Sequence, residues 1–521
     1  MIVSRCVTLR KAEDWQPFRR CNFNIGLIYI QASISPDHLF LRFLHKYKFM
    51  AVLAEEKNTF YTYLSAFRNI TGNAFVFTDE ESLDKFARDE TENLYFLPDI
   101  VIKPRTALEI SAIMKICNDK RIPVTPRGAG TGLSGGALPH KGGVVISFER
   151  MNSILKIDER NLQVITEPGV ITEVLQNAVK EKGLFYPPDP SSRGSCFIGG
   201  NIAENSGGPK AVKYGVVKDY VLNLEVVLPN GDIIWTGANV LKNSTGYNLT
   251  QLMVGSEGTL GLVTKIVLKL LPFPKYDLLM LVPFNDLQKA GAAVSAIFRA
   301  GFIPSALELV EINALKIVSK FVDSTVVPVS DGMEAHLIIE LDGNHQEILL
   351  TEMEAIARLL EEFDCGELFF ADDAQQKAEL WKMRRRTAEA VKLAGYTIEE
   401  DTVVPRAALP DLIKGVKALG AEHNFEVVCY GHAGDGNLHI RIKKEGCIHS
   451  LNNPEIIPAL KALFQLVKAL GGTISGEHGI GLVQKEYMDI VFDETGMQLM
   501  RGIKKLFDPN NILNSGKIFD C

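Results

Sequence analysis

Two histidines beside a predicted turn, and a Glu-His pair later in the chain, carry the clearest chemistry. Residues 427–442 form two β-type runs around an Asp-Gly turn, which predicts a hairpin. The turn would bring His432 and His439 together, although residues seven apart on one straight strand face opposite sides. Glu477 and His478 lie between glycines. Two histidines and one glutamate suit a divalent metal such as Zn, Mn or Fe, which leaves His478 as a candidate base. The alternative is four unrelated polar loop residues.

A second candidate is Arg384, in the run Arg384-Arg385-Arg386 on a predicted helix over residues 374–393. A planar guanidinium can form two parallel hydrogen bonds with a carboxylate, which suits it to bind an organic acid. The other interpretation is an ordinary solvated face of a helix.

The third feature is a loop at residues 126–137 with five glycines between positions 128 and 136. Such a loop brings backbone N–H groups close to an anion, so it is a candidate phosphate cradle. It contains G-x-G-x-x-G, but Pro139 and a predicted strand follow it, whereas a Rossmann site needs a helix there. No Gly-Lys-Ser/Thr follows, which excludes a P-loop. A connecting loop without a ligand is the remaining alternative.

Two further glycine-rich segments, at residues 194–208 and 246–264, resemble the first in composition. Three such walls suit one long ligand that contains phosphate, ribose and a ring system.

The predicted elements form an α+β pattern without regular βαβ alternation. A capping box at Thr106 and Glu109 begins one helix. We expect strands over residues 99–102, 122–126, 143–148, 154–157, 163–166, 278–283, 306–310 and 335–341, and helices over 56–71, 171–182, 287–300, 346–362, 374–393 and 483–489.

Length and composition set wider bounds. The 521 residues favour at least two domains, and the net charge of −7 gives no indication of nucleic-acid binding. Eight scattered cysteines without a CxxC pair are typical of reduced thiols in an intracellular protein. No apolar run is long enough for a membrane span. Residues 1–49 are basic and are interpreted as a targeting segment or, in preference, as an over-long start before Met50.

The three glycine-rich segments together resemble the flavin-binding domain of the vanillyl-alcohol-oxidase/PCMH-type FAD oxidoreductases. The similarity extends from about residue 95 to the C-terminus and is greatest to the branch that contains the flavin-binding chain of glycolate oxidase, D-lactate dehydrogenase and D-2-hydroxyglutarate dehydrogenase. The resemblance implies a two-subdomain FAD-binding domain at residues 50–272 and a ferredoxin-like α+β cap domain at 273–521, with a C-terminal helical segment and a tail that returns to the flavin. The residues expected to bind FAD are Pro126, Arg127, Gly128, Ala129, Gly130, Thr131, Gly132, Ser134, Gly135, Gly136, Pro188, Gly199, Gly200, Asn201, Asn205, Gly207, Gly208, Glu257, Gly261, Val263 and Asn514.

The resemblance also implies roles for the polar residues of the second half. The family's metal ligands match His432, His439 and Glu477, its base matches His478, and its carboxylate-binding arginine matches Arg384. Some relatives attach the flavin to a histidine of the first loop. This loop has none, since His140 lies beyond it, so the FAD is expected to be non-covalent.

The substrate expected from these matches is a small D-2-hydroxy acid of the glycolate or D-lactate type. Polar side chains that hold a second carboxylate in the D-2-hydroxyglutarate branch are replaced here by Ala388 and Glu399, and an asparagine of that branch by Arg441. Arg441 is an alternative partner for a second acid group.

The predicted reaction is FAD-dependent oxidation to the 2-oxo acid with help from the metal. The alternatives are a metal-free phenol oxidase or ether-lipid synthase of the same fold, and a non-catalytic flavin-binding subunit. Because no iron–sulfur motif is present, electrons are expected to pass to a separate protein, a quinone or oxygen. We further expect partner subunits or a homodimer, and a cytoplasmic protein that is peripheral to a membrane at most.

Overall fold

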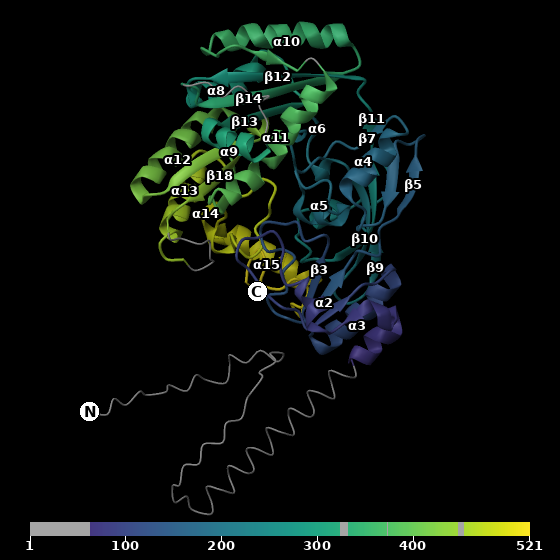
Figure 1. The fold of residues 1–521 in the computed structure, drawn as a ribbon. Coiled ribbons are helices and arrows are strands. Elements are labelled where there is room, and N and C mark those ends of the chain that lie inside the picture. Colours follow the sequence, from purple (N-terminus) through teal and green to yellow (C-terminus); the bar gives the residue numbers. More distant parts are fainter. Residues whose placement is uncertain (1–62, 323–331, 372, 446–452, 521) are drawn as a thin grey trace, which may run out of the picture.

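The computed structural model describes residues 63–322, 332–371, 373–445 and 453–520, which form an N-terminal part and a larger cap (Figure 1). Residues 1–49, and the beginning of the helix predicted over 56–71, lie outside the described residues; residues 63–71 are helical. The predicted α+β class is confirmed, because helices and mixed or antiparallel sheets occur in both parts.

The N-terminal part contains two sheets. The first has the order β1-β2-β4-β3 and combines three parallel strands with one antiparallel edge strand. The second is antiparallel with the order β5-β6-β10-β8-β9. The strands are β1 (Val76–Phe77), β2 (Ile100–Ile102), β3 (Val124–Arg127), β4 (Val144–Ser147), β5 (Ile154–Asp158), β6 (Gln163–Thr166), β8 (Val221–Val227), β9 (Ile233–Trp235) and β10 (Leu262–Lys269), with a separate pair of β7 (Leu184–Phe185) and β11 (Leu271–Pro272).

Short helices connect these strands. The predicted cap of α3 is present, since the Thr106 side chain accepts a hydrogen bond from Glu109 N at 3.2 Å. The Glu109 carboxylate accepts from Arg105 N instead of the N-cap N–H, so the capping box is displaced by one residue. The helices are α2 (Glu80–Asp84), α3 (Ala107–Lys120), α4 (Thr172–Lys180), α5 (Ile198–Glu204), α6 (Ala211–Tyr214) and α7 (Leu249–Met253). Helix α5 was not predicted, because two glycines in seven residues argue against a helix.

The cap is built on one antiparallel sheet with the order β15-β12-β14-β13-β17-β18-β16. Its strands are β12 (Tyr276–Phe284), β13 (Ala306–Glu311), β14 (Ala335–Gly343), β15 (Phe369–Phe370), β16 (Ile398–Val403), β17 (Glu426–Gly431) and β18 (Asn437–Lys443). Strand β12 has apolar side chains on both faces of the sheet. Met280 and Val282 belong to one hydrophobic core, and Leu279 and Leu281, which point to the opposite face, belong to another.

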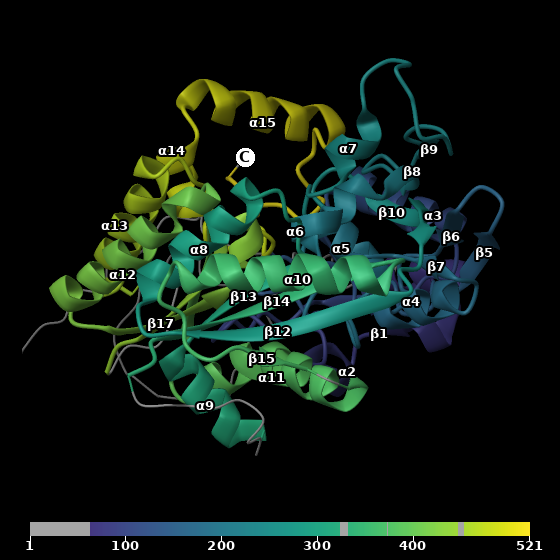
Figure 2. The same ribbon diagram turned by 90° about the horizontal axis from the view of Figure 1, so that it is seen from above.

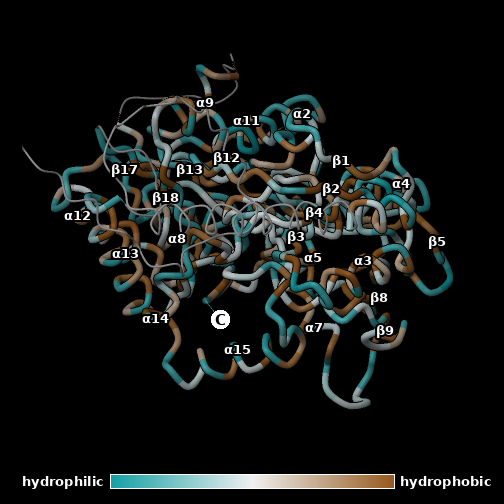
Figure 3. Tube along the Cα trace, turned by 90° about the horizontal axis from the view of Figure 1, so that it is seen from below, coloured by the Kyte–Doolittle hydropathy of each residue, from teal (hydrophilic) through white to brown (hydrophobic). Residues whose placement is uncertain are grey.

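Helices cover both faces of this sheet (Figure 2). One face packs against α8 (Leu287–Arg299), α10 (Gln346–Glu361), α12 (Leu409–His423) and α13 (Ile457–Ala469). The other face packs against α9 (Ile312–Val322) and α11 (Ala374–Leu393), and this second layer carries Arg384. In Figure 3, brown apolar and teal polar stretches alternate along helices of the cap such as α12 and α13, as expected of helices that bury one side.

The C-terminal segment returns to the N-terminal part. After α14 (Met488–Val491) and α15 (Glu494–Phe507), Leu513 pairs in parallel with Val124 of β3, and Asn514 N donates to Val124 O at 2.8 Å. The helix predicted over residues 483–489 is confirmed in part: a 3₁₀ turn at Lys485–Tyr487 leads directly into the four-residue α14, so the helical residues begin later and end at Val491. The chain bends here because Leu482 N and the Gly481 backbone dock on the glycine loop.

Ion pairs join the cap to the N-terminal part. Lys213 Nζ lies 2.6 Å from Asp342 Oδ1, Tyr214 donates to the same oxygen at 2.8 Å, and Lys210 pairs with Glu340. Glu340 also accepts a hydrogen bond from Trp381 Nε1 on α11 at 2.8 Å. This contact connects the helix of Arg384 to the junction between the two parts.

Within the described residues, no helix combines the length and hydropathy needed to cross a membrane.

Candidate active site

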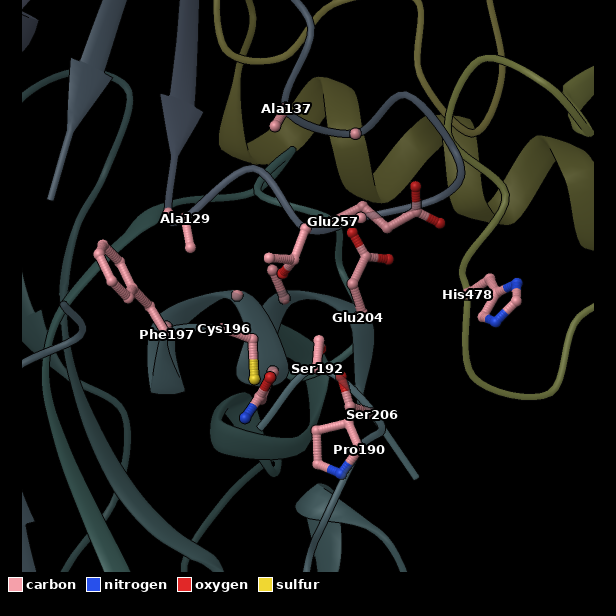
Figure 4. A pocket seen from close by; sticks show the side chains of 18 of the residues that line it. Ala129, Ala137, Pro190, Ser192, Cys196, Phe197, Glu204, Ser206, Glu257 and His478 are labelled. Carbon is pink, nitrogen blue, oxygen red and sulfur yellow. The ribbon is translucent and has the colours of Figure 1, made fainter. Parts of the chain in front are cut away.

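One cavity joins the glycine-rich walls of the N-terminal part to the histidine cluster of the cap. Figure 4 shows part of its lining, with His478 on a loop of the C-terminal half opposite Phe197 and Cys196. Arg384, His439, Glu477 and His478 line the same cavity as the glycine loop. Residues separated by more than 300 positions in the chain therefore face one space.

Most of the predicted FAD-binding residues line this cavity. They are Pro126, Arg127, Gly128, Ala129, Gly130, Thr131, Gly132, Gly136, Gly199, Gly200, Asn201, Glu257, Gly261, Val263 and Asn514. Ser134, Gly135, Pro188, Asn205, Gly207 and Gly208 are not among its lining residues. Gly207 and Gly208 instead pack on the protein, since a Cβ there would lie 2.9 Å from Glu477 and 2.7 Å from the Asp189 backbone.

The glycine loop has the geometry of a cradle. Gly130 has a φ of +77°, a backbone conformation that strongly favours glycine, and a Cβ on it would lie 2.2 Å from the Arg127 guanidinium. A Cβ on Gly132 would meet no atom within 4 Å, which leaves its backbone open to a ligand. Arg127 lines the cavity and adds a positive charge to this wall.

The predicted metal ligands come together. Tyr430 on β17 pairs with His439 on β18, so the hairpin is confirmed, and the rings of His432 and His439 lie 5.5 Å apart. Glu477 Oε1 lies 3.4 Å from His432 Nε2 and 3.5 Å from His439 Nε2. Ligand atoms about 2.1 Å from a tetrahedral ion are about 3.4 Å from one another, so these three atoms fit a shared cation.

Glu308 on β13 fixes one of these ligands. Its two oxygens lie 2.8 and 2.9 Å from His432 Nδ1, which leaves Nε2 directed at Glu477. Burial opposes the charge on His432, but Glu308 and Glu477 outweigh it and raise the pKa of His432 well above its ordinary value. Burial lowers the pKa of His439 to about 4. The ring is therefore uncharged at neutral pH, and a nitrogen lone pair can bind a metal.

Asp401 on β16 holds the loop of Glu477 and His478. Its Oδ2 accepts hydrogen bonds from the backbone N–H groups of Gly476, Glu477 and His478 at 2.8, 2.7 and 2.9 Å. Its Oδ1 accepts from Asn437 Nδ2 at 2.6 Å. One buried carboxylate therefore sets the backbone position of a metal ligand and of the candidate base.

His478 lies against His439, with ring centroids 5.3 Å apart. Burial disfavours the charged ring, but Asp401, Glu399 and Glu477 outweigh burial and raise the pKa of His478. The acidic neighbours therefore make His478 a stronger base, which suits a side chain that accepts a proton.

Arg384 is buried, with 3% of its surface exposed, and Nη2 lies 2.6 Å from Glu308 Oε2. Its Nε has no hydrogen-bond partner among the described residues. Since Arg384 lines the cavity, this guanidinium can bind an anion there.

Glu399 also lines the cavity, and its carboxylate pairs with the buried Arg441. Arg441 Nε donates to Tyr430 OH at 3.3 Å, so Arg441 serves contacts within the protein. Arg441 is not among the lining residues of the cavity.

Sequence reasoning did not identify Glu308 and Asp401 as supports of the site. Both lie within strands that are otherwise buried, and both side chains are fully buried. For Glu308, a charged residue inside an apolar β-type run was the available signal, since such a charge needs a partner. Asp401 follows Glu399 and Glu400 in a polar strand, so no such signal marked it.

Comparison with known proteins agrees with this geometry. Residues 98–237 match the FAD binding domain family, and residues 273–518 match the family of FAD linked oxidases, C-terminal domain. The chain is 41% identical to glycolate oxidase subunit GlcD of Bacillus subtilis over 439 residues, which cover 83% of this chain and 92% of the relative. The chain belongs to the FAD-linked oxidases. This confirms the predicted family and identifies an FAD-linked oxidoreductase.

Other relatives of this FAD-linked oxidase have related names. It is 37% identical to D-lactate dehydrogenase of Anaerostipes hadrus, with 87% of this chain and 96% of the relative covered. It is 31% identical to D-2-hydroxyglutarate dehydrogenase of Stutzerimonas stutzeri, with 85% and 96% covered.

A solved structure confirms the predicted PCMH-type fold of this FAD-linked oxidase. p-Cresol methylhydroxylase with bound substrate superposes with a TM-score of 0.73 at 19% identity, covering 88% of this chain and 97% of that chain. At this identity the likeness concerns the fold alone.

Proposed function

We propose that this FAD-linked oxidase oxidises a small D-2-hydroxy acid, of the D-lactate or glycolate type, to the 2-oxo acid with help from a divalent metal. The observation that carries the proposal is one cavity in which a flavin-type glycine loop faces Arg384, His478, His439 and Glu477. His432 completes the ligand set beside the last two.

The residues of the cavity fit non-covalent FAD. The open backbone at Gly132 and the charge of Arg127 suit the phosphates. His140 is not among the lining residues, which supports a flavin without a histidyl bond. When bound, the flavin supplies a hydride acceptor.

The ligand set fits a divalent cation, because its atoms have the mutual distances described above and Glu308 orients His432 from behind. When bound, the cation supplies Lewis acidity toward a hydroxyl group and a positive charge that lowers the pKa of the adjacent His478.

The chain's own residues then divide the remaining work. Arg384 binds the substrate carboxylate and thereby orients the hydroxyl-bearing carbon within the cavity. A ring nitrogen of His478 takes the hydroxyl proton as the C–H hydrogen leaves with its electron pair. Asp401 keeps His478 in place and remains a carboxylate, since His478, His439 and its backbone bonds overcome burial and lower its pKa.

The surroundings of Arg384 favour a small substrate. Glu399 presents a carboxylate to the cavity, and Arg441 is already paired with it. A dicarboxylate would place its distal acid against Glu399, so D-lactate and glycolate fit better than D-2-hydroxyglutarate.

The direct test is anaerobic mixing of the FAD-loaded protein with D-lactate, glycolate, L-lactate and D-2-hydroxyglutarate, followed by flavin absorbance. We expect D-lactate or glycolate to bleach the flavin fastest. His478→Ala should retain FAD but lose bleaching by at least about a hundredfold, the effect of one general base. No bleaching by any acid would refute the proposal.

A chelator separates this proposal from a metal-free oxidase of the same fold, such as a phenol oxidase or ether-lipid synthase. We expect chelation to abolish turnover while the flavin spectrum persists, and divalent ions to restore turnover. Electrons would then leave the reduced flavin to a separate acceptor, which a panel of dyes, quinones and oxygen would identify by class.

A further inference from the structure

Glu204, at the end of α5, is an acid that the proposed reaction does not use. It lines the flavin cavity, and its Oε2 has no hydrogen-bond partner among the described residues. A buried carboxyl oxygen without a partner is costly unless a ligand completes its contacts.

Its position within the cavity is close to the catalytic loop. A Cβ on Gly136 would lie 3.0 Å from Glu204 Oε1, and one on Gly479 would lie 2.2 Å from Glu204 Oε2. The Glu204 carboxyl therefore lies between the glycine loop and the residue that follows His478. Figure 4 shows it beside the carboxyl of Glu257 and facing the open space.

Glu204 differs from Glu257 in its contacts. The two oxygens of Glu257 accept backbone hydrogen bonds from Ile480 and Gly481, both at 2.7 Å. These bonds favour the carboxylate form, although burial outweighs them and raises the pKa of Glu257. The nearby Lys517 donates to Gly136 O at 2.6 Å and to Asn514 Oδ1 at 2.5 Å. Of the two acids, Glu204 is the one that lacks donors to stabilise a charge.

The protonation state follows from these contacts. Burial, and then the charge of Glu257, raise the pKa of Glu204 well above its ordinary value. This direction favours the protonated form of Glu204, which presents an O–H group as a donor.

We propose that Glu204 donates a hydrogen bond to the isoalloxazine ring and thereby raises the reduction potential of the bound flavin. The edge of this ring carries mostly acceptor atoms, and its negative charge increases on reduction, so a donor stabilises the reduced form. The assignment to the ring, and not to the phosphates, rests on the proposed role of the adjacent His478 at the reacting centre.

The test compares the FAD-loaded wild type with Glu204→Gln, which keeps a donor, and Glu204→Met, which removes it. Glu181→Gln, at an exposed position of the same part, is the control. Potentials are measured by reduction with xanthine and xanthine oxidase beside a reference dye, which needs no substrate of this enzyme. A protein without flavin absorbance would refute FAD binding itself, which distinguishes that failure from failure of this proposal.

We expect the methionine variant to shift the equilibrium toward oxidised flavin by up to about tenfold, or about 30 mV for a two-electron couple. The glutamine variant and the control should stay near the wild type. An unchanged potential in Glu204→Met would overturn the proposal. A raised potential in Glu204→Gln would also overturn it, because that result would mean that Glu204 is an anion.

Infrared difference spectra of flavin reduction provide a second measurement in case the methionine variant does not fold. The proposal requires a protonated carboxylic C=O band in the wild type that is missing in Glu204→Gln. Its absence from the wild type, or its persistence in the variant, would overturn the assignment.

Discussion

Replacement of Asp401 by asparagine tests how the site is held together. The carboxylate accepts hydrogen bonds from three successive backbone N–H groups, at Gly476, Glu477 and His478, and a fourth from Asn437. An asparagine of the same size has one oxygen and one NH₂ group, so it can satisfy the loop or Asn437 but not both.

The magnitude follows from these bonds. Three charge-assisted bonds become neutral at a cost of about 1 kcal/mol each, so the loop loses on the order of 3 kcal/mol. Because Glu477 and His478 then lose their fixed positions, we expect kcat/KM to fall by about a hundredfold and metal affinity to decrease. FAD should still bind, since Asp401 does not line the flavin cavity.

The assays are steady-state oxidation of the preferred hydroxy acid, metal content of the purified protein and thermal unfolding, with the exposed Asp411→Asn as control. The pKa of Asp401 is lowered in the folded protein, so its stabilisation is complete well above the ordinary pKa of about 4 and is lost as the pH falls below it. The variant should lack this acid-dependent loss. Wild-type activity and metal content in Asp401→Asn would refute the assigned role.

Three further predictions follow from the same geometry. Arg384→Lys should raise KM for the hydroxy acid by at least about tenfold, because an ammonium cannot form the two parallel bonds of the guanidinium, and an unchanged KM would show that the carboxylate binds elsewhere. Glu399→Gln should raise kcat/KM for D-2-hydroxyglutarate relative to D-lactate, and an unaltered ratio in competition assays would remove Glu399 from substrate selection. The metal-free protein carries a proton on His432, because Glu308 and Glu477 overcome burial and raise its pKa, so metal binding must release that proton. Calorimetry in buffers of different ionisation enthalpy should detect the release, and affinity should increase about tenfold per pH unit below the raised pKa; binding that is independent of pH would contradict this account.

The sequence by itself determined most of the local elements and indicated FAD as the cofactor. Glycine spacing at residues 126–137 and the strand after Pro139 indicated the flavin loop, because positive φ angles and close backbone approach are properties of the residues themselves. The hairpin of His432 and His439 was predictable for the same reason, since a turn of few residues specifies its own pairing.

Only the tertiary structure decided what supports the site. Glu308 and Asp401 are remote in sequence from His432 and His478, and they contact them because β13 and β16 each lie in the sheet that carries the histidine hairpin. Which of two similar acids receives backbone donors was equally undetermined, since a distant loop gives them to Glu257 and not to Glu204 Oε2. Strand order and loop docking create these contacts, and neither is encoded in the local pattern of residues.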